Sequence, residues 1–503
     1  VGTRTALPRQ QTLRALIDWS YDLLSEDEKI LFRRVSVFAS GWTIESAEEV
    51  CADEVLPRAK FLEALLRLVD KSLVARTGGA ETRYTMLETI REYAYEKLVL
   101  HQNGVEAANE LETQQARHYE YFTRLAETAE LHLRGKGQIE WGERLEAEHP
   151  NLSTALQWAL AQPNADDALR LVGPLGLYLI QRGRISDGQD WYDKALAKRD
   201  ANTNVHYLAK AYSGAGSIAR EQGDLSKAVS LHSQALACFE QVRDNDGIAL
   251  SLHNLAQQRT WQGNYDEAEA LIQQALTTAR ENNVQWLLPR TLSLFGVILI
   301  RKGDYRAAIP QHEEALALAR ANGDSNTMSV ILHNLGGIES LEGNFTRALT
   351  LLSESLHLAQ VQQALSLIIA NLAEQGLLYL RQGDYPAAVE VAQRGSKMAL
   401  DASMQELIAR SGQWLAAGLA YMGQFERAVK LWGAILTLRE KIGAPLDPMD
   451  SAEYEKAVAH VREQIGAERF AELLAQGRGL STDQIRELIS SETIRATENI
   501  TLI

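Results

Sequence analysis

The chain has 503 residues, of which 46% are apolar and 23% are charged, so it is long enough for several domains with buried cores. Acidic residues outnumber basic ones by 66 to 51, and the formal charge of -15 argues against non-specific wrapping of nucleic acid or anionic membrane. The two cysteines, Cys51 and Cys238, lie far apart and exclude a disulfide framework or a thiolate metal site.

The N-terminus has no signal-peptide h-region, and the apolar stretches are far shorter than the roughly 20 residues of a membrane helix. These features predict a cytoplasmic protein. Because the chain begins at Val1, without Met and in polar sequence, we expect it to be a fragment of something longer.

The first hundred residues combine helical patterns with two short strands. Helices are expected over 12–23, 26–39, 44–51 and 57–71. The segments "SLVART" and "TRYTML" then flank a Gly-Gly turn, which predicts a β hairpin near residues 73–86. Helices followed by a two-stranded wing indicate a winged helix-turn-helix domain over residues 1–98.

The next part, residues 99–162, is expected to be a helical linker that caps the repeats after it. It includes "WGERLEAEHPNLSTALQWAL" at 141–160. From there a short motif of the type GDYRAA returns again and again, and its leading glycine keeps one constant spacing without slippage. The seven leading glycines are Gly183, Gly223, Gly263, Gly303, Gly343, Gly383 and Gly423.

Each repeat also carries a small residue seven positions before its glycine, where a bulky side chain would hold two helices apart. These residues are Gly176, Gly216, Ala256, Gly296, Gly336, Gly376 and Ala416. Apolar residues after the glycine, at Ala308 and Leu316 for example, mark the buried stripe of a second helix. Each repeat is therefore predicted to be a helix, a short turn and a second helix in contact with the first.

This pattern resembles the tetratricopeptide repeat in its 40-residue form. The resemblance implies a mainly all-α fold, with about seven repeats over residues 163–445 in a right-handed α-solenoid with a concave groove. Capping helices are expected over 446–490, and a tail over 491–503.

The segments 4–51, 65–74 and 83–98 resemble the part that follows the ATPase module in bacterial STAND signal-transduction ATPases, many of which are related to LuxR-type transcriptional regulators. Residues 145–160 resemble the helical linker of these proteins. The family resemblance implies an ATPase module upstream of Val1, with ATP or ADP and Mg²⁺ bound there. The triplet Met86, Leu87, Glu88 stands where related switches carry Met-His-Asp, which puts the usual contact with ADP in doubt.

The sequence predicts no catalytic function, cofactor or metal site for the chain itself. It has no G-x-x-x-x-G-K-[ST] loop for a triphosphate, and its eleven histidines are scattered without H-x-x-x-H spacing. The closing LuxR-type DNA-binding domain of some relatives is also absent before Ile503.

The expected recognition helix of the winged-helix domain carries Lys60, Arg67 and Lys71 at i, i+7 and i+11, which could meet phosphates of DNA. Glu63 and Asp70 dilute that basic stripe. The family resemblance favours a domain that docks inside the larger protein, so DNA contact is the lesser expectation.

The groove is the stronger candidate for a ligand site. In tetratricopeptide domains the first helix of each pair lines the concave face, at positions that here are −13, −10, −9, −6 and −2 relative to the turn glycine. Cations and amides occupy several of these positions, which favours an extended peptide with acidic side chains. The candidate residues are Arg170, Lys210, Arg290, Arg410, Arg301 and Arg381, with Asn254 and Asn334 at position −9 and His253 and His333 ahead of them.

The leading hypothesis is a regulatory sensor fragment, in which the superhelix binds an inducer or partner protein and the winged-helix domain passes the signal to an upstream nucleotide switch. A constitutive protein scaffold is the alternative from another class. A direct DNA-binding transcriptional regulator is the third possibility.

Overall fold

The computed structural model describes residues 8–78, 82–100, 110–442, 446 and 448–491. These residues are mainly helical, and the strands among them form one two-stranded antiparallel sheet, as predicted. The chain divides into two compact units, residues 1–254 and 255–503, which are described separately.

The first unit begins with the winged-helix part. Its elements are α1 (Pro8–Asp22), α2 (Glu26–Arg34), η1 (Val35–Val37), α3 (Ile44–Cys51), α4 (Arg58–Asp70), β1 (Ala75–Thr77), β2 (Arg83–Thr85) and α5 (Glu88–Leu100). Ser25 and Thr43 each start a helix with a reciprocal capping box. The predicted hairpin is confirmed, with Ala75 opposite Thr85. Its Gly-Gly turn falls partly outside the described residues.

The predicted single helix over 26–39 is wrong at its end. The α-helix stops at Arg34, a 3₁₀ turn follows, and Phe38 takes an extended conformation. Two β-branched residues, Val35 and Val37, disfavour continuation of the helix. The break turns the fully buried Phe38 toward Trp42, with their ring centroids 5.6 Å apart.

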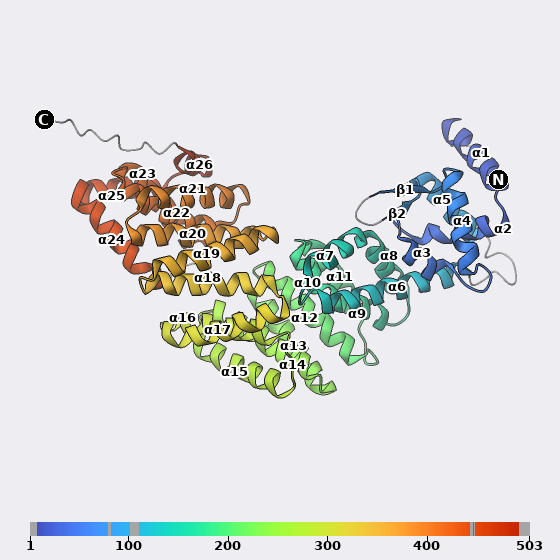
Figure 1. The fold of residues 1–503 in the computed structure, drawn as a ribbon, viewed down its shortest axis with the longest axis horizontal. Helices are drawn as coiled ribbons and strands as arrows, with labels where there is room; N and C mark the ends of the chain where they lie inside the picture. Colours follow the sequence, from blue (N-terminus) through green and yellow to red (C-terminus); the bar gives the residue numbers. More distant parts are fainter. Residues whose placement is uncertain (1–7, 79–81, 101–109, 443–445, 447, 492–503) are drawn as a thin grey trace. The chain divides into compact units, whose positions relative to one another are not determined.

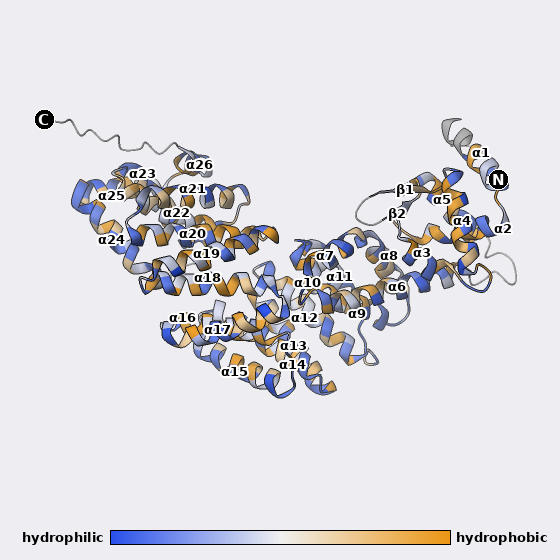
Figure 2. Cartoon of the chain, viewed as in Figure 1, coloured by the Kyte–Doolittle hydropathy of each residue, from blue (hydrophilic) through white to orange (hydrophobic). Residues whose placement is uncertain are grey.

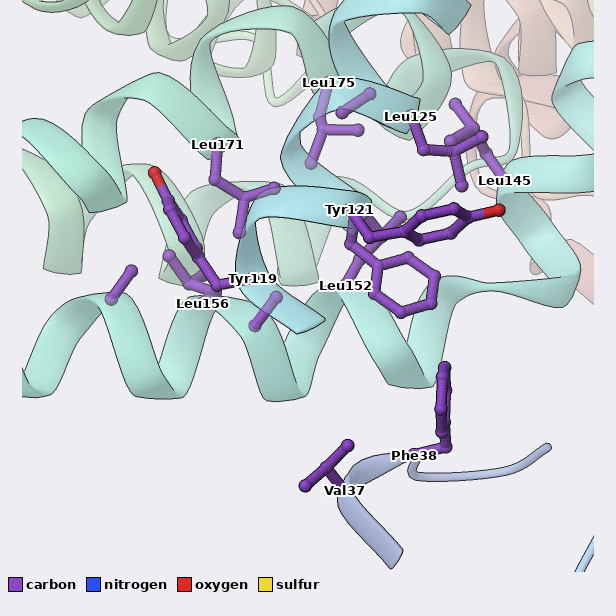
Figure 3. Packing of buried hydrophobic residues seen from close by; sticks show 14 of the residues in the cluster. Val37, Phe38, Tyr119, Tyr121, Leu125, Leu145, Leu152, Leu156, Leu171 and Leu175 are labelled. Atoms are coloured by element: carbon purple, nitrogen blue, oxygen red, sulfur yellow. The ribbon is translucent and has the colours of Figure 1, made fainter. Parts of the chain in front are cut away.

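The linker helices are α6 (Glu110–His132), α7 (Gln138–Ala147) and α8 (His149–Ala161), and α6 packs against η1, α3 and α5 of the winged-helix part. Figure 3 shows Val37 and Phe38 reaching toward the side chains of these helices. Glu110 at the start of α6 accepts bonds of 2.8 Å from both Arg33 and Arg34. Asn151 of α8 is fully buried and accepts a hydrogen bond from the Ala39 N–H. Buried polar contacts thus fix the linker to the winged helix.

The repeats begin in the first unit and continue through the second, where each has an A helix before the turn glycine and a B helix after it (Figure 1). The first A helix is broken by η3 (Gly173–Leu175), which contains Pro174. The repeat helices of the first unit are α9 (Asp166–Val172), α10 (Gly176–Gln181), α11 (Ile185–Ala197), α12 (Val205–Glu221) and α13 (Leu225–Val242); α14 (Asn245–Trp261) spans the boundary between the units.

The second unit holds four complete helix pairs and the partner of α14. Its repeat helices are α15 (Tyr265–Glu281), α16 (Leu288–Arg301), α17 (Tyr305–Asn322), α18 (Ser325–Leu341), α19 (Phe345–Val361), α20 (Leu365–Gln382), α21 (Tyr385–Asp401), α22 (Gln405–Tyr421) and α23 (Phe425–Ile442). The expected capping helices follow as α24 (Pro448–Ile465), α25 (Ala467–Arg478) and α26 (Thr482–Ser490). Residues 492–503 of the predicted tail lie outside the described residues.

The turn glycines explain why the motif is so regular. All seven have a positive φ, between 67° and 86°, a conformation that costs other residues about 1–2 kcal/mol. The residue after the glycine caps the B helix in several repeats: Asp304 accepts a hydrogen bond from the Ala307 N–H, and Asp384 does the same for Ala387. The motif is therefore a left-handed turn followed by an N-cap.

Where the small residue of the A helix is glycine, it lies against the residue sixteen positions later on the B helix. A Cβ added at Gly336 would stand 2.6 Å from Cγ of Leu352, and one at Gly296 would stand 2.6 Å from Nε2 of His312. The predicted contact between the two helices is confirmed. Close approach lets both helices bury an apolar stripe while their other faces stay polar, as the mixed colouring of the repeat helices in Figure 2 shows.

Among the described helices, none combines the length and the apolar character that crossing a membrane requires.

His312 leads to a prediction about pH. Burial lowers the pKa of this fully buried side chain to about 4, so the unfolded chain binds its proton more readily between about pH 6.5 and pH 4. Stability should therefore fall as the pH falls through this range, by up to about 3 kcal/mol from this group alone. Chemical denaturation of the His312→Leu variant should show a smaller loss of stability over this pH range than the parent chain shows. The exposed His357→Leu serves as control, and equal pH dependence in all three proteins would contradict the assignment.

Candidate functional site

The A helices α18, α20 and α22 pack in succession within the second unit and place polar side chains on a shared face. We call this set the polar face. It consists of His333, Asn334, Asn371, Glu374, Arg410 and Gln413. All six lie between positions −13 and −9 relative to a turn glycine, so the regular repeat itself brings them together.

His333 and Asn371 connect the first two helices of the polar face. Nδ1 of His333 lies 3.2 Å from Oδ1 of Asn371, and both side chains are buried. Burial and the charge of Arg410 lower the pKa of His333 to about 4, against the opposite effects of Glu374 and Asn371. His333 is therefore a neutral hydrogen-bonding group at pH 7.

Glu374 and Arg410 connect α20 to α22. Nη2 of Arg410 donates to Oε2 of Glu374 across 2.8 Å, and Glu374 is only 2% exposed. The other carboxylate oxygen, Oε1, is buried and has no hydrogen-bond partner among the described residues. A buried acceptor of this kind is costly unless something donates to it.

Two hydrogen-bond donors on the polar face are also buried without a partner among the described residues. Nδ2 of Asn334 is buried and finds no acceptor in the described part of the chain. The amide of Gln413 accepts a 3.0 Å hydrogen bond from Arg439 through Oε1, whereas its buried Nε2 has no partner there. The polar face thus offers two uncommitted donors and one uncommitted acceptor.

The predicted groove cations bind acidic groups of the chain itself. In the first unit Arg170 bonds to Glu120 and Glu127 of α6 at 2.8 Å each, and Lys210 to Glu130 of the same helix at 2.8 Å. These carboxylates raise the pKa of Arg170 well above its usual range. Sequence reasoning missed that α6 supplies an acidic stripe for these cations.

The same holds in the second unit. Arg290 lies 3.4 Å from the buried carboxylate of Asp324, and Arg381 donates to Oγ of Ser340 at 2.9 Å. Arg301 is exposed at the end of α16. The predicted groove cations, which we expected to attract acidic ligands, are therefore largely neutralised by carboxylates of the protein itself.

His253 and Asn254 are buried on α14, with 8% and 6% exposure. Asn254 and Asn334 belong to different units. A ligand shared by the two asparagines stays a prediction.

The three candidate DNA contacts of the winged-helix part all have carboxylate partners. Lys60 lies 3.3 Å from Asp27, Arg67 2.6 Å from Glu63, and Lys71 2.7 Å from Glu28. The outer side of the same helix, α4, exposes two leucines, Leu62 and Leu66. This surface suits a protein contact better than a phosphate backbone.

Part of the polar face could be predicted from the sequence. Gln413 stands ten positions before Gly423 and Glu374 nine before Gly383, both places already assigned to the concave side. Asn371, twelve before Gly383, falls outside the positions considered. Its role follows from the distance to His333, for which the sequence has no signal.

Comparison with known proteins agrees with this architecture. Residues 24–99 match the winged helix-turn-helix domain family, and residues 247–321 match the tetratricopeptide repeat family, two non-catalytic modules. The chain is therefore a winged helix-turn-helix protein with a solenoid of tetratricopeptide repeats, as predicted.

Two regulatory proteins are similar to most of the chain. It is 32% identical over 361 residues to the "Putative HTH-type transcriptional regulator Rv0890c" of Mycobacterium tuberculosis, an alignment covering 70% of this chain and 40% of that protein. The crystal structure of a STAND protein with a tetratricopeptide repeat sensor from Pyrococcus horikoshii covers 95% of this chain and 65% of its own, with a TM-score of 0.58 and 17% identity. The chain thus shares the winged-helix and repeat architecture of that STAND protein.

A second similar structure is a Rap protein in complex with Competence and Sporulation Factor. It covers 75% of this chain and 97% of its own, with a TM-score of 0.51 and 14% identity. At these identities the two solved structures show a common fold. The chain spans less than half the length of the mycobacterial regulators that it matches.

The contact between Arg410 and Glu374 predicts the effect of a substitution. Arg410→Gln should leave the buried carboxylate without its charged partner and destabilise the second unit by on the order of 2 to 3 kcal/mol. Adding Glu374→Gln should restore most of that loss, because no charge then stays buried. Denaturant unfolding of the two variants and of Glu374→Gln alone measures the coupling. Additive effects would show that the pair does not interact.

Proposed function

We propose that the chain is the regulatory part of a STAND-type protein, and that its polar face binds a peptide or an extended segment of a partner protein. The observation that carries this proposal is the set of buried, uncommitted atoms: the amide donors of Asn334 and Gln413, and the carboxylate acceptor of Glu374. A peptide backbone offers carbonyls and N–H groups in alternation, so it can satisfy both kinds of atom at once.

The comparisons support a sensor role. The Pyrococcus horikoshii protein is described as having a tetratricopeptide repeat sensor, and the Rap protein was solved in complex with Competence and Sporulation Factor. Both share their fold with this chain over three quarters of its length or more. By analogy with these folds, we assign the repeats of this chain to ligand recognition.

Most of the predicted groove cations already bind carboxylates of the chain, so these do not attract a ligand as free charges. Arg290 binds Asp324, and Arg410 binds Glu374. An acidic group on the ligand must therefore exchange with an internal carboxylate, which adds little net affinity but selects ligands that reproduce its geometry. We propose the same exchange at Arg170 and Lys210, where α6 provides the internal carboxylates.

We further propose that the full-length protein carries a nucleotide-binding ATPase module that the winged-helix part contacts. Two observations support this: the curated relatives are much longer than the region they share with this chain, and the winged-helix part exposes Leu16 and Trp19 on α1 and Leu23 just after it. Exposed apolar residues at i, i+3 and i+7 are typical of a helix that packs on another domain. The domain boundaries at 98, 162, 445 and 490 are part of this proposal.

Selection of short peptides from a displayed library on the purified chain provides ligands for a direct test. We expect the affinity of selected peptides for Asn334→Ala to fall by about 1–2 kcal/mol, the value of one hydrogen bond in a partly desolvated site, as measured by calorimetry. The melting temperature should change little, because Nδ2 of Asn334 bonds to no described group of the protein.

Gln360→Ala, which removes an exposed amide from the B helix α19, is the matched control and should bind as the parent chain does. Equal affinity of Asn334→Ala and the parent would move the binding site away from the polar face. In the full-length protein, a bound peptide should alter nucleotide turnover; binding without any such change would favour the scaffold alternative.

A further inference from the structure

A cavity of about 730 Å³ lies in the first unit, where the winged-helix part meets the linker. Residues of η1 and α5 form one side of this cavity, and residues of α6 and α8 form the other. Its volume is typical of sites that hold small molecules. The cavity lies outside the repeats and shares no residue with the polar face.

His118 is the buried polar residue of this cavity. It lines the cavity, is only 2% exposed, and its ring packs between Phe38 and Phe122 with centroid distances of 5.2 and 4.6 Å. Its Nε2 atom is buried and has no hydrogen-bond partner among the described residues. Burial lowers the pKa of His118 to about 4, so the ring is neutral at pH 7.

Asn151 lies beside His118 and raises its pKa, against the effect of burial. Its Nδ2 donates to the carbonyl of Gly41 and to Glu148, and its Oδ1 accepts from the Ala39 N–H. A neutral imidazole has one protonated and one unprotonated nitrogen, and we assign the tautomer in which Nε2 is unprotonated. In this tautomer Nε2 is an acceptor that needs an N–H group from outside.

The other charged groups of the lining also favour a donor. Glu92 and Glu112 are exposed carboxylates at the cavity. The guanidinium of Arg91 is already committed, since Nε and Nη2 bond to Glu88 and Nη1 donates to the carbonyl of Ser36. The described lining therefore has an excess of negative charge, within a chain whose formal charge is -15.

An aromatic surface completes the lining. Trp158 is half-buried, packs on Tyr119 with a centroid distance of 4.9 Å, and also lines the cavity. An indole face attracts planar groups and cations more strongly than other aromatic side chains do. Acceptors combined with an indole face are the features that recognise a flat cationic group.

We propose that this cavity is a binding site for a planar organic cation of the amidinium or guanidinium class. The cation stacks on Trp158, its charge lies near Glu92 and Glu112, and one of its N–H groups donates to Nε2 of His118. A ligand in this position touches both the winged-helix part and the linker, and so stabilises their junction. The inference goes beyond the proposed function and does not depend on it.

Three probes of one shape test the charge requirement: benzamidine, the neutral benzamide and the anionic benzoate. Ligand-observed saturation-transfer NMR and calorimetry on the whole chain should detect binding of benzamidine, at least tenfold weaker binding of benzamide, and none of benzoate. Equal binding of the three probes, or no binding of benzamidine, would overturn the proposal.

Two variants locate the site. Removing both carboxylates with Glu92→Gln and Glu112→Gln should weaken the binding of benzamidine by about three- to tenfold, as expected for two exposed charges. Gln157→Trp, at an exposed position of α8 that lines the cavity, should block binding while the melting temperature is kept. Glu143→Gln removes an exposed carboxylate from α7, outside the lining, and is the matched control. Benzamidine binding that neither variant changes would place the probe elsewhere.

Discussion

The rest of the structure depends on the close contact between the two helices of each repeat. The contact point of the A helix is always glycine or alanine. Where the B helix places Leu352 or His312 against it, there is no room even for an added Cβ. This contact sets the distance between the helices, and the left-handed glycine turn sets their direction. With both fixed in every repeat, successive A helices present equivalent positions side by side, and polar residues far apart in the sequence become neighbours, as His333 and Asn371 do.

The winged-helix part and the linker follow a different principle, in which buried polar contacts hold two elements together. Glu110 accepts hydrogen bonds from both Arg33 and Arg34, and Nδ2 of Asn151 donates to the carbonyl of Gly41. Such networks are stable only when every member has a partner, so they fix one arrangement of the two parts. In our proposals, the cavity between parts that are fixed in this way is a preformed site, whereas the polar face of the repeats exchanges internal partners for those of a ligand. The two proposed sites differ in charge and in the ligand that they favour.

The sequence predicted the fold well because its strongest signals are local. A glycine that recurs at a constant spacing, the small residue seven positions before it and the apolar stripe after it specify the helix pair without reference to the rest of the chain. The break after Arg34 was missed because helical periodicity continues through Val35 and Val37, and only the burial of Phe38 shows why the helix stops. The site was predicted less well. Repeat positions identified His333, Asn334 and Arg410, but the carboxylates that neutralise Arg170 and Lys210 come from a helix 43 to 80 positions earlier, and such long-range pairs leave no pattern in a single sequence.

The most direct test of this account is a double-mutant cycle at the contact between Gly336 and Leu352, measured by denaturant unfolding. Gly336→Ala should cost about 1–3 kcal/mol, because the added methyl group has no room beside Leu352. In the Leu352→Ala background, which reproduces the pairing of Gly376 with Ala392 one repeat later, the same substitution should cost little. A cost of Gly336→Ala that is the same in both backgrounds would show that this contact does not set the distance between the helices.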